Sequence, residues 1–177
     1  MARAGDTIEN PVTGERVVFR RTASETDGQA LEYELLFRPQ GFVVQEHLHP
    51  SQDERHEVVA GRLGLRLPTG ERVLEPGDAV VVPATTPHRL FAVGDEPVQA
   101  VFELRPALRT AELLELFFCL AQAGKVSRKG IPRPLDLAVI AREFEREGYA
   151  TKPPLPVQRA LFAPLAAIGR LTGAGRC

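Results

Sequence analysis

The sequence contains few cysteines and gives no reason to expect that crosslinks hold it together. Its two cysteines, Cys119 and Cys177, lie far apart, and Cys119 falls within an apolar segment. A chain of 177 residues can bury roughly 70% of its unfolded surface, which is enough for a stable core without disulfides. We therefore expect Cys119 to be a lone buried thiol, with a reactive thiol as the alternative. Nothing in this content calls for an oxidising compartment.

Long apolar runs are also missing. No stretch of about 18 apolar residues is present, which excludes a spanning helix, and the first residues lack the apolar core of a signal peptide. We therefore expect a cytoplasmic protein. The net charge of −1 indicates no polyanionic partner, and no helix-turn-helix pattern is found, so we expect no binding to nucleic acid.

The charge is distributed unevenly along the chain. Residues 1–106 carry 11 Lys and Arg against 17 Asp and Glu, whereas residues 107–177 carry 11 against 6. This change near Pro106 predicts two parts. We expect a β domain over 1–106 and a helical extension over 107–177 that packs on this domain or on a partner.

The first part has the pattern of an all-β fold. Short segments rich in β-branched and apolar residues alternate with turns that contain Gly or Pro, and no helical period is found before residue 106. Ala30 to Phe37, for example, places Leu31, Tyr33, Leu35 and Phe37 on one face of a strand. Many short strands at this spacing predict a sandwich or a barrel.

All four histidines lie in two short stretches of this part. His47 and His49 are two positions apart, so on a strand both would face the same side, and Glu54 follows across a turn. His88 comes from the second stretch. Three imidazoles and one carboxylate suit a single divalent Fe, Mn, Co, Ni or Zn ion with one or two open positions for a substrate or dioxygen.

The two stretches resemble the paired signatures of the cupin superfamily. The first signature, G-x5-H-x-H-x4-E-x6-G, is matched at every fixed place, and the second, G-x5-P-x-G-x2-H-x3-N, is matched at three. The matching residues are Gly41, His47, His49, Glu54, Gly61, Gly77, Pro83 and His88. Thr85 and Ala92 replace the expected glycine and asparagine. Thr85 resists the positive φ that glycine tolerates, so the turn geometry there is in question.

The resemblance implies a fold and a ligand set. The fold is a double-stranded β-helix, the cupin jelly-roll barrel, here followed by the C-terminal helical extension. The expected metal ligands are His47, His49, Glu54 and His88, and a homodimer is expected because it is usual in the family.

Other residues are candidates for a substrate pocket beside the metal. By alternation, His56 points inward with Glu54, either as a polar wall residue or as a group that binds substrate or moves protons. Gln45 shares the face of His47 and is either a contact to the ligand or substrate or a packing residue. The remaining inward positions are apolar and favour a small organic substrate, aromatic or ketonic. The predicted pocket residues are Gln45, Val43, Val58 and Leu90, and the predicted catalytic residues are Glu54 and His56.

After Pro106 the period becomes helical. Helices are predicted from Thr110 to Gly124, from Leu135 to Gly148 and from Val157 to Leu171, with Pro164 expected to kink or break the last one. The third helix carries an apolar stripe of Val157, Leu161, Leu165 and Ile168, and no acidic residue follows Glu147. We expect this stripe to pack on the barrel or a partner subunit, with peripheral contact of 157–171 to an anionic membrane as the alternative.

Three functions are consistent with these features. The resemblance implies a metal-dependent enzyme acting on a small organic molecule, with an oxygenase as the commonest case. A non-redox isomerase or cyclase would use the metal to polarise a carbonyl, and Zn or Mn would serve there. A non-catalytic module would use the metal to hold a ligand, and the basic tail to contact a partner or membrane.

Overall fold

The computed structural model describes residues 2–39 and 45–177, so Gly41 and Val43 of the predictions lie outside the described residues. The strands are β1 (Thr7–Glu9), β2 (Arg16–Arg21), β3 (Leu31–Phe37), β4 (His47–Leu48), β5 (Asp53–Ala60), β6 (Leu63–Leu67), β7 (Gly70–Leu74), β8 (Ala79–Val82), β9 (Arg89–Ala92), β10 (Val98–Arg105) and β11 (Tyr149–Ala150). The helices are α1 (Thr110–Gln122), α2 (Pro134–Glu143) and α3 (Leu155–Leu171), with a short 3-10 turn at Ala23–Glu25.

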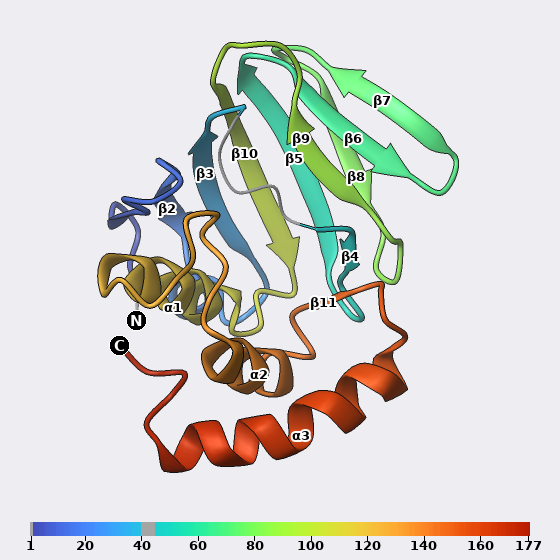
Figure 1. Ribbon diagram of the computed structural model, residues 1–177. Helices are drawn as coiled ribbons and strands as arrows, with labels where there is room; N and C mark the ends of the chain where they lie inside the picture. The colour runs from blue at the N-terminus through green and yellow to red at the C-terminus, as the bar shows by residue number, and fades with distance from the viewer. Residues whose placement is uncertain (1, 40–44) are drawn as a thin grey trace.

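The strands form antiparallel sheets. One has the order β1-β2-β3-β10-β5-β8, a second has the order β7-β6-β9, and β11 pairs with β4. Figure 1 shows the helices gathered at one end of the strands, with α3 outermost. The predicted all-β part and the helical extension after it are both present. Closure of the sheets into one barrel stays a prediction.

Cross-strand neighbours build the inner face of the larger sheet. Tyr33 of β3 lies opposite Phe102 of β10, and Phe102 lies opposite His56 of β5. The Tyr33 and Phe102 rings stack with centroids 5.2 Å apart, and the His56 ring meets Phe102 edge-on at 4.8 Å. In the next row, Leu104 lies opposite Glu54. The predicted alternation therefore holds, because Glu54, His56 and Val58 of β5 are all buried.

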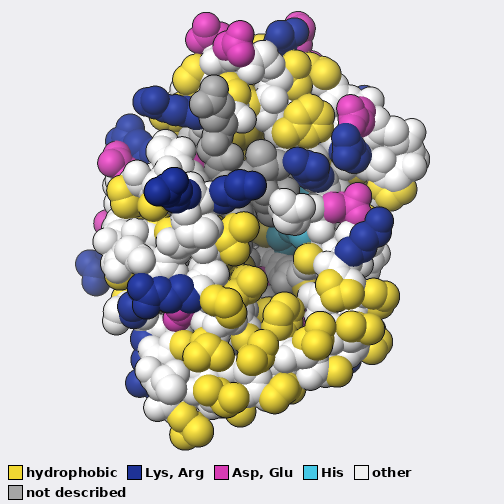
Figure 2. Space-filling model, viewed as in Figure 1, with side chains coloured by type: hydrophobic (Ala, Val, Ile, Leu, Met, Phe, Trp, Pro, Cys, Tyr) yellow, Lys and Arg dark blue, Asp and Glu magenta, His cyan; other side chains and the backbone are white. Residues whose placement is uncertain are grey.

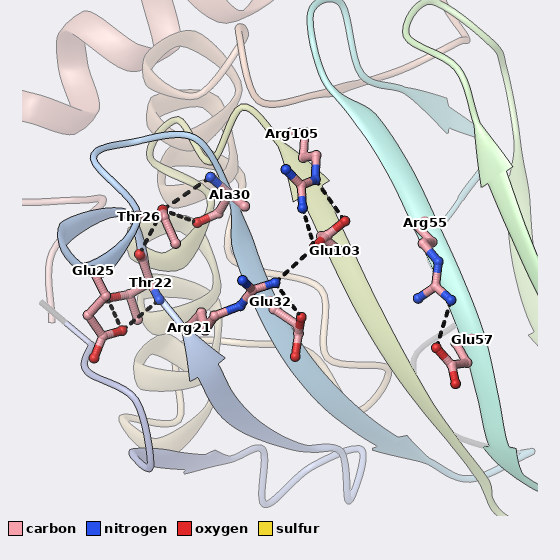
Figure 3. Close-up of polar contacts among 10 residues, drawn as sticks. All are labelled: Arg21, Thr22, Glu25, Thr26, Ala30, Glu32, Arg55, Glu57, Glu103 and Arg105. Carbon is pink, nitrogen blue, oxygen red and sulfur yellow. Dashed lines mark hydrogen bonds and ion pairs between the residues drawn. The ribbon is translucent and has the colours of Figure 1, made fainter.

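The outer face of the same sheet is covered by exposed ion pairs, shown in Figure 3. Arg21 reaches Glu32 at 2.9 Å and Glu103 at 3.1 Å, and Arg105 contacts Glu103 at 2.8 Å. Pairs of this kind are each worth about 0–1 kcal/mol because water and salt screen them. They form a solvated surface, so the chemistry of this sheet lies on its inner face.

Helices α1 and α2 follow the predicted ranges in part. Leu120 of α1 is buried against Ile140 and Phe144, and Leu113, Leu116 and Phe117 of α1 pack around them. The second helix is shorter than predicted, since α2 begins at Pro134 and ends at Glu143. No described helix is long and apolar enough to cross a membrane.

Two predictions for the extension were wrong. Cys119 is not a lone thiol: it forms a disulfide with Cys177, with Cα atoms 5.8 Å apart, because the chain after α3 returns to α1. The apolar stripe of α3 does not pack on the barrel, so that expectation was wrong too, whereas packing on a partner subunit and contact with a membrane stay predictions. Val157, Leu161, Leu165 and Ile168 face away from the molecule, and the opposite side, with Gln158, Ala166 and Gly169, is buried. Helix α3 also runs past Pro164 without a break.

Candidate metal centre

Hydrogen bonds on both sides fix the position of β4. The His47 N–H donates to His88 O at 3.0 Å, and the His88 N–H donates to His47 O at 2.8 Å. The two residues therefore form a direct cross-strand pair. On the other side, Tyr149 and Ala150 of β11 pair with β4. The imidazoles of His47 and His88 consequently lie with centroids 4.3 Å apart, although 41 positions separate them in the sequence.

The structure brings the four predicted ligands together. One donor atom from each of His47, His49, Glu54 and His88 lies within 4.8 Å of the other three. The Glu54 Oε2 atom is 2.9 Å from His88 Nε2 and 3.3 Å from His49 Nε2. Glu54 and His88 are buried, whereas His47 and His49 are partly exposed. Figure 2 shows histidine surface within a hollow, so the cluster can be reached from outside.

The outer ring nitrogen of each histidine ligand is paired with a main-chain carbonyl. The Nδ1 atoms of His47, His49 and His88 lie 3.0, 2.5 and 3.0 Å from the carbonyl oxygens of Gln45, Glu147 and Thr86, respectively. A carbonyl oxygen can only accept, so each Nδ1 carries the proton and each Nε2 presents its lone pair to the cluster. This is the arrangement that metal-binding histidines usually have.

The residues present therefore fit a divalent metal ion. Buried His49 Nε2 has no hydrogen-bond partner among the described residues, although a buried polar nitrogen normally has one. A metal ion would supply that partner. Three neutral imidazoles and one carboxylate suit Fe, Mn, Co, Ni or Zn, and this donor set does not select one of them.

The protonation states of Glu54 and His47 agree with this assignment, whereas that of His49 in the metal-free protein does not. Burial alone would raise the pKa of Glu54, but the imidazoles of His56, His49 and His88 around it hold that pKa well below its usual range. Burial and the neighbouring His88 lower the pKa of His47 to about 3. Burial acts in the same direction on His49, but the Glu54 carboxylate and the Glu147 carbonyl outweigh it and raise its pKa.

His56 lies beside the cluster without belonging to it. It is fully buried, its Nε2 is 3.4 Å from Glu54 Oε2, and neither ring nitrogen has a hydrogen-bond partner among the described residues. Burial lowers the pKa of His56 to about 4, so the ring is neutral near pH 7. Whether this unpartnered neutral imidazole beside the ligand cluster contacts a bound molecule stays a prediction.

The remaining pocket predictions have mixed outcomes. Val58 is buried in the core and Leu90 packs partly buried against it, so both lie on the inner side. The Gln45 side chain is exposed, and its contact with His47 is made by its main-chain carbonyl. Whether these residues touch a substrate stays a prediction.

Three residues near the cluster were not singled out from the sequence. Burial, and after it the charge of Glu54, raises the pKa of Tyr33 well above its usual value, so a neutral phenol lies near the cluster. The amide of Gln52 is buried and donates to Pro106 O at 2.8 Å and to Thr110 Oγ1 at 3.0 Å, which joins the first motif to the start of α1. The strand alternation signalled Tyr33, but no local pattern signalled Gln52 or Glu147.

The turns of the two motifs explain some of their fixed residues. Gly61 has φ +74°, and a Cβ there would come within 2.3 Å of the Pro97 carbonyl, so no other residue fits without a shift of the chain. Thr85 has φ 65° although it is not glycine, and its N–H donates to His49 O at 2.7 Å. The replacement in the second motif therefore keeps the turn geometry at the cost of backbone strain.

Comparison with known proteins defines the class. Residues 33–102 match the family described as Cupin domain, and this part of the chain is a cupin domain. The resemblance seen in the two motifs is thereby confirmed.

Among curated proteins, polyketide synthase CurC of Streptomyces cyaneus is 37% identical over 71 residues, which are 40% of this chain and 46% of that protein. The match thus spans about half of the relative's length.

Solved structures are similar at lower identity. KdgF from Halomonas sp. has a TM-score of 0.48 and 23% identity, and the match covers 55% of this chain and 84% of that one. The DMSP lyase DddQ from Ruegeria pomeroyi has a TM-score of 0.40 and 28% identity over 46% of this chain and 40% of that one. A sugar phosphate isomerase of the cupin superfamily, from Silicibacter pomeroyi, has a TM-score of 0.47 and 21% identity. The match covers 56% of this chain and 70% of that one.

Proposed function

We propose that this protein is a metal-dependent enzyme that acts on a small organic substrate with an enolisable carbonyl, such as a β-diketone. One observation carries the proposal. The Nδ1 atom of each histidine ligand is hydrogen-bonded to a main-chain carbonyl, and this leaves the three Nε2 atoms facing the buried carboxylate of Glu54. His47, His49, Glu54 and His88 would hold the ion. A divalent ion there would act as a Lewis acid toward a substrate oxygen.

His56 is the residue we assign to proton transfer. It is neutral, buried and free of hydrogen bonds among the described residues, so one ring nitrogen can accept a proton from the carbon next to a carbonyl. Glu54 stays ionised at neutral pH, because its pKa is far below its usual range. It therefore serves as a ligand and as a second proton acceptor if one of its oxygens is released.

The surroundings of the cluster indicate the substrate class. The inner face near His56 is formed by the stacked rings of Tyr33 and Phe102 and by aliphatic side chains. No Lys or Arg is fully buried among the described residues, so no buried cation is there to pair with an anionic group. These features support an uncharged molecule with an aromatic or ketonic part, which the neutral phenol of Tyr33 would meet as a hydrogen-bond donor.

Two reactions can come after removal of that proton. Attack of dioxygen on the resulting enolate is the oxygenase-like reaction implied by the family resemblance. Ring closure or isomerisation without redox change is the second candidate, and the similarity to a polyketide synthase favours it, because polyketides carry several carbonyl groups. Both candidates require the same first step on this chain.

The test separates proton removal from the later steps of either reaction. Protein loaded with Fe(II), Mn(II), Ni(II) or Zn(II) is given a β-diketone or a flavonol in D2O, and deuterium incorporation, oxygen uptake and product mass are measured. We expect metal-dependent deuterium exchange that the His56→Phe variant loses although it keeps its metal.

The outcomes are distinct. Oxygen uptake with Fe(II) but not with Zn(II) identifies an oxygenase, and a product of unchanged mass with Zn(II) identifies an isomerase or cyclase. If no metal form exchanges or converts any substrate while ligands still raise the thermal stability, the protein is a binding module and the proposal is wrong.

A further inference from the structure

The outer side of α3 is an apolar surface without a partner. Its large side chains are exposed: Val157 by 45%, Leu161 by 55%, Leu165 by 36%, Ile168 by 51% and Leu171 by 88%. They lie three or four positions apart and therefore form one stripe along the helix. Soluble domains normally turn such a stripe inward, so its exposure needs an explanation.

The helix is held in this orientation by contacts on its other side. Gln158 donates to the carbonyls of Ala150 and Pro153, both at 2.6 Å. Gly169 lies so close to α2 that a Cβ on it would stand 2.9 Å from Val139 Cγ2. The stripe cannot turn toward the protein without breaking these contacts, so it is a fixed feature of the surface.

The segment that carries the stripe is positively charged. Residues 148–177 contain Lys152, Arg159, Arg170 and Arg176 and no acidic residue. Arg159 pairs with Glu145 at 2.5 Å, and no ion pair is formed by the other three among the described residues. In Figure 2, hydrophobic side chains gather over α3, and Lys and Arg side chains lie beside them.

We propose that this side of α3 binds the surface of an anionic lipid membrane, with the helix lying in the plane of the bilayer. Its 17 residues extend about 25 Å, and its leucine, valine and isoleucine side chains would enter the boundary between headgroups and acyl chains. Lys152 before the helix and Arg170 near its end would then meet anionic headgroups at both ends.

A second copy of the chain fits this surface less well. A two-fold interface brings the same patch of both subunits together, so the basic segments 148–177 of the two copies would approach each other. No acidic residue of 148–177 is available to pair with them. Lipid headgroups supply the missing negative charge, whereas a second copy adds more positive charge.

The test uses flotation of the whole protein with lipid vesicles. We expect binding to vesicles in which phosphatidylglycerol makes up about a third of the lipid, much weaker binding to pure phosphatidylcholine, and a loss of binding as salt is raised. Arg170→Gln should weaken the association about fivefold, the usual contribution of one basic residue at such a surface. Leu161→Asp combined with Ile168→Asp should lower it more than tenfold.

A matched control is available on β7. Val73 is 50% exposed, as exposed as the stripe residues, but lies in the three-stranded sheet, so Val73→Asp should leave vesicle binding unchanged. Because the altered residues of α3 are exposed, the midpoint of unfolding should also stay the same. Absence of vesicle binding, or binding that survives the double substitution, overturns the proposal. A dimer in sedimentation that the double substitution separates, without vesicle binding, would show that a second copy occupies the surface.

Discussion

His49 Nδ1 donates to the main-chain carbonyl of Glu147 at 2.5 Å, across 98 positions of sequence. This bond joins a predicted metal ligand of the cupin domain to the C-terminal extension. Strand β11, which begins two residues after Glu147, pairs with β4 and so lies against His47 as well. The extension therefore helps to orient two of the ligands, although no residue of it belongs to the ligand cluster.

Metal content tests the ligand assignment. We expect His47→Ala and His88→Ala to lower metal affinity by more than the roughly 10- to 100-fold that loss of an outer hydrogen-bond partner costs. Elemental analysis of freshly purified protein measures this. His56→Phe is the control and should keep its metal, because His56 is outside the cluster. Parental metal content in both alanine variants would show that these histidines are not ligands.

The strained turn at Thr85 predicts a stabilising substitution. A left-handed conformation costs a non-glycine residue about 1–2 kcal/mol, and glycine loses about 0.5–1 kcal/mol of chain entropy in return. We therefore expect Thr85→Gly to raise the free energy of unfolding by about 0.5–1 kcal/mol, measured with denaturant on metal-free protein. Thr86→Gly, which has no positive φ to relieve, should lower it. Equal effects at the two positions would contradict strain at Thr85.

The buried amide of Gln52 predicts a large effect from a small change. Gln52→Leu keeps the volume but leaves the Pro106 carbonyl and the Thr110 hydroxyl without this donor. We expect a loss of about 2–3 kcal/mol in the free energy of unfolding. Gln122→Leu removes an exposed bond to Glu9 O and should cost less than about 0.5 kcal/mol. A similar small loss at both sites would show that the Gln52 bonds do not join the two parts.

Stability of the metal-free protein should fall on acidification. The folded-state pKa values of His47 and His56 are about 3 and 4, below the value near 6.5 of an unfolded chain. Between those values the unfolded state binds two protons that the folded state does not bind, whereas His49, whose pKa is raised, is protonated in both states below about pH 6 and does not affect the slope there. The net uptake of two protons lowers the free energy of unfolding by about 2.7 kcal/mol per pH unit between about pH 6 and pH 4.5.

The His56→Phe variant checks the sign of this effect. It removes one of these two protons, so the slope over the same pH range should fall to about half. Denaturant unfolding of chelator-treated protein at several pH values measures both slopes. A parent protein that gains stability on acidification would show that the histidines are protonated in the folded state.

Much of the cupin domain could be predicted because its signals are local. The alternation on β3 and β5 places Tyr33 and His56 on the inner face, and the spacing of His47, His49 and Glu54 predicts the cluster that the structure contains. The turn geometry at Thr85 was in question from the sequence, and the structure shows that the positive φ is kept there. In each case the signal lies within one strand or one turn.

The errors concern relations between distant segments. The stripe on α3 has the period of a buried face, but the helix packs through Gly169 and Ala166, whose small side chains allow α2 to approach closely. Apolar periodicity gives no information about which side of a helix a neighbour can approach. The pairing of Cys119 with Cys177 depends on where the chain returns after α3, and this too is not encoded locally. The division at Pro106 stays a prediction drawn from charge and periodicity.

The pairing of β4 with β11 also sets an order of events during translation. The histidines of the first motif leave the ribosome about a hundred residues before Glu147 and Tyr149, which hold them from outside. A nascent chain shorter than this has its imidazoles but not the hydrogen bonds that aim them. A metal ion that requires these oriented imidazoles would consequently be bound only after residues 147–150 have emerged.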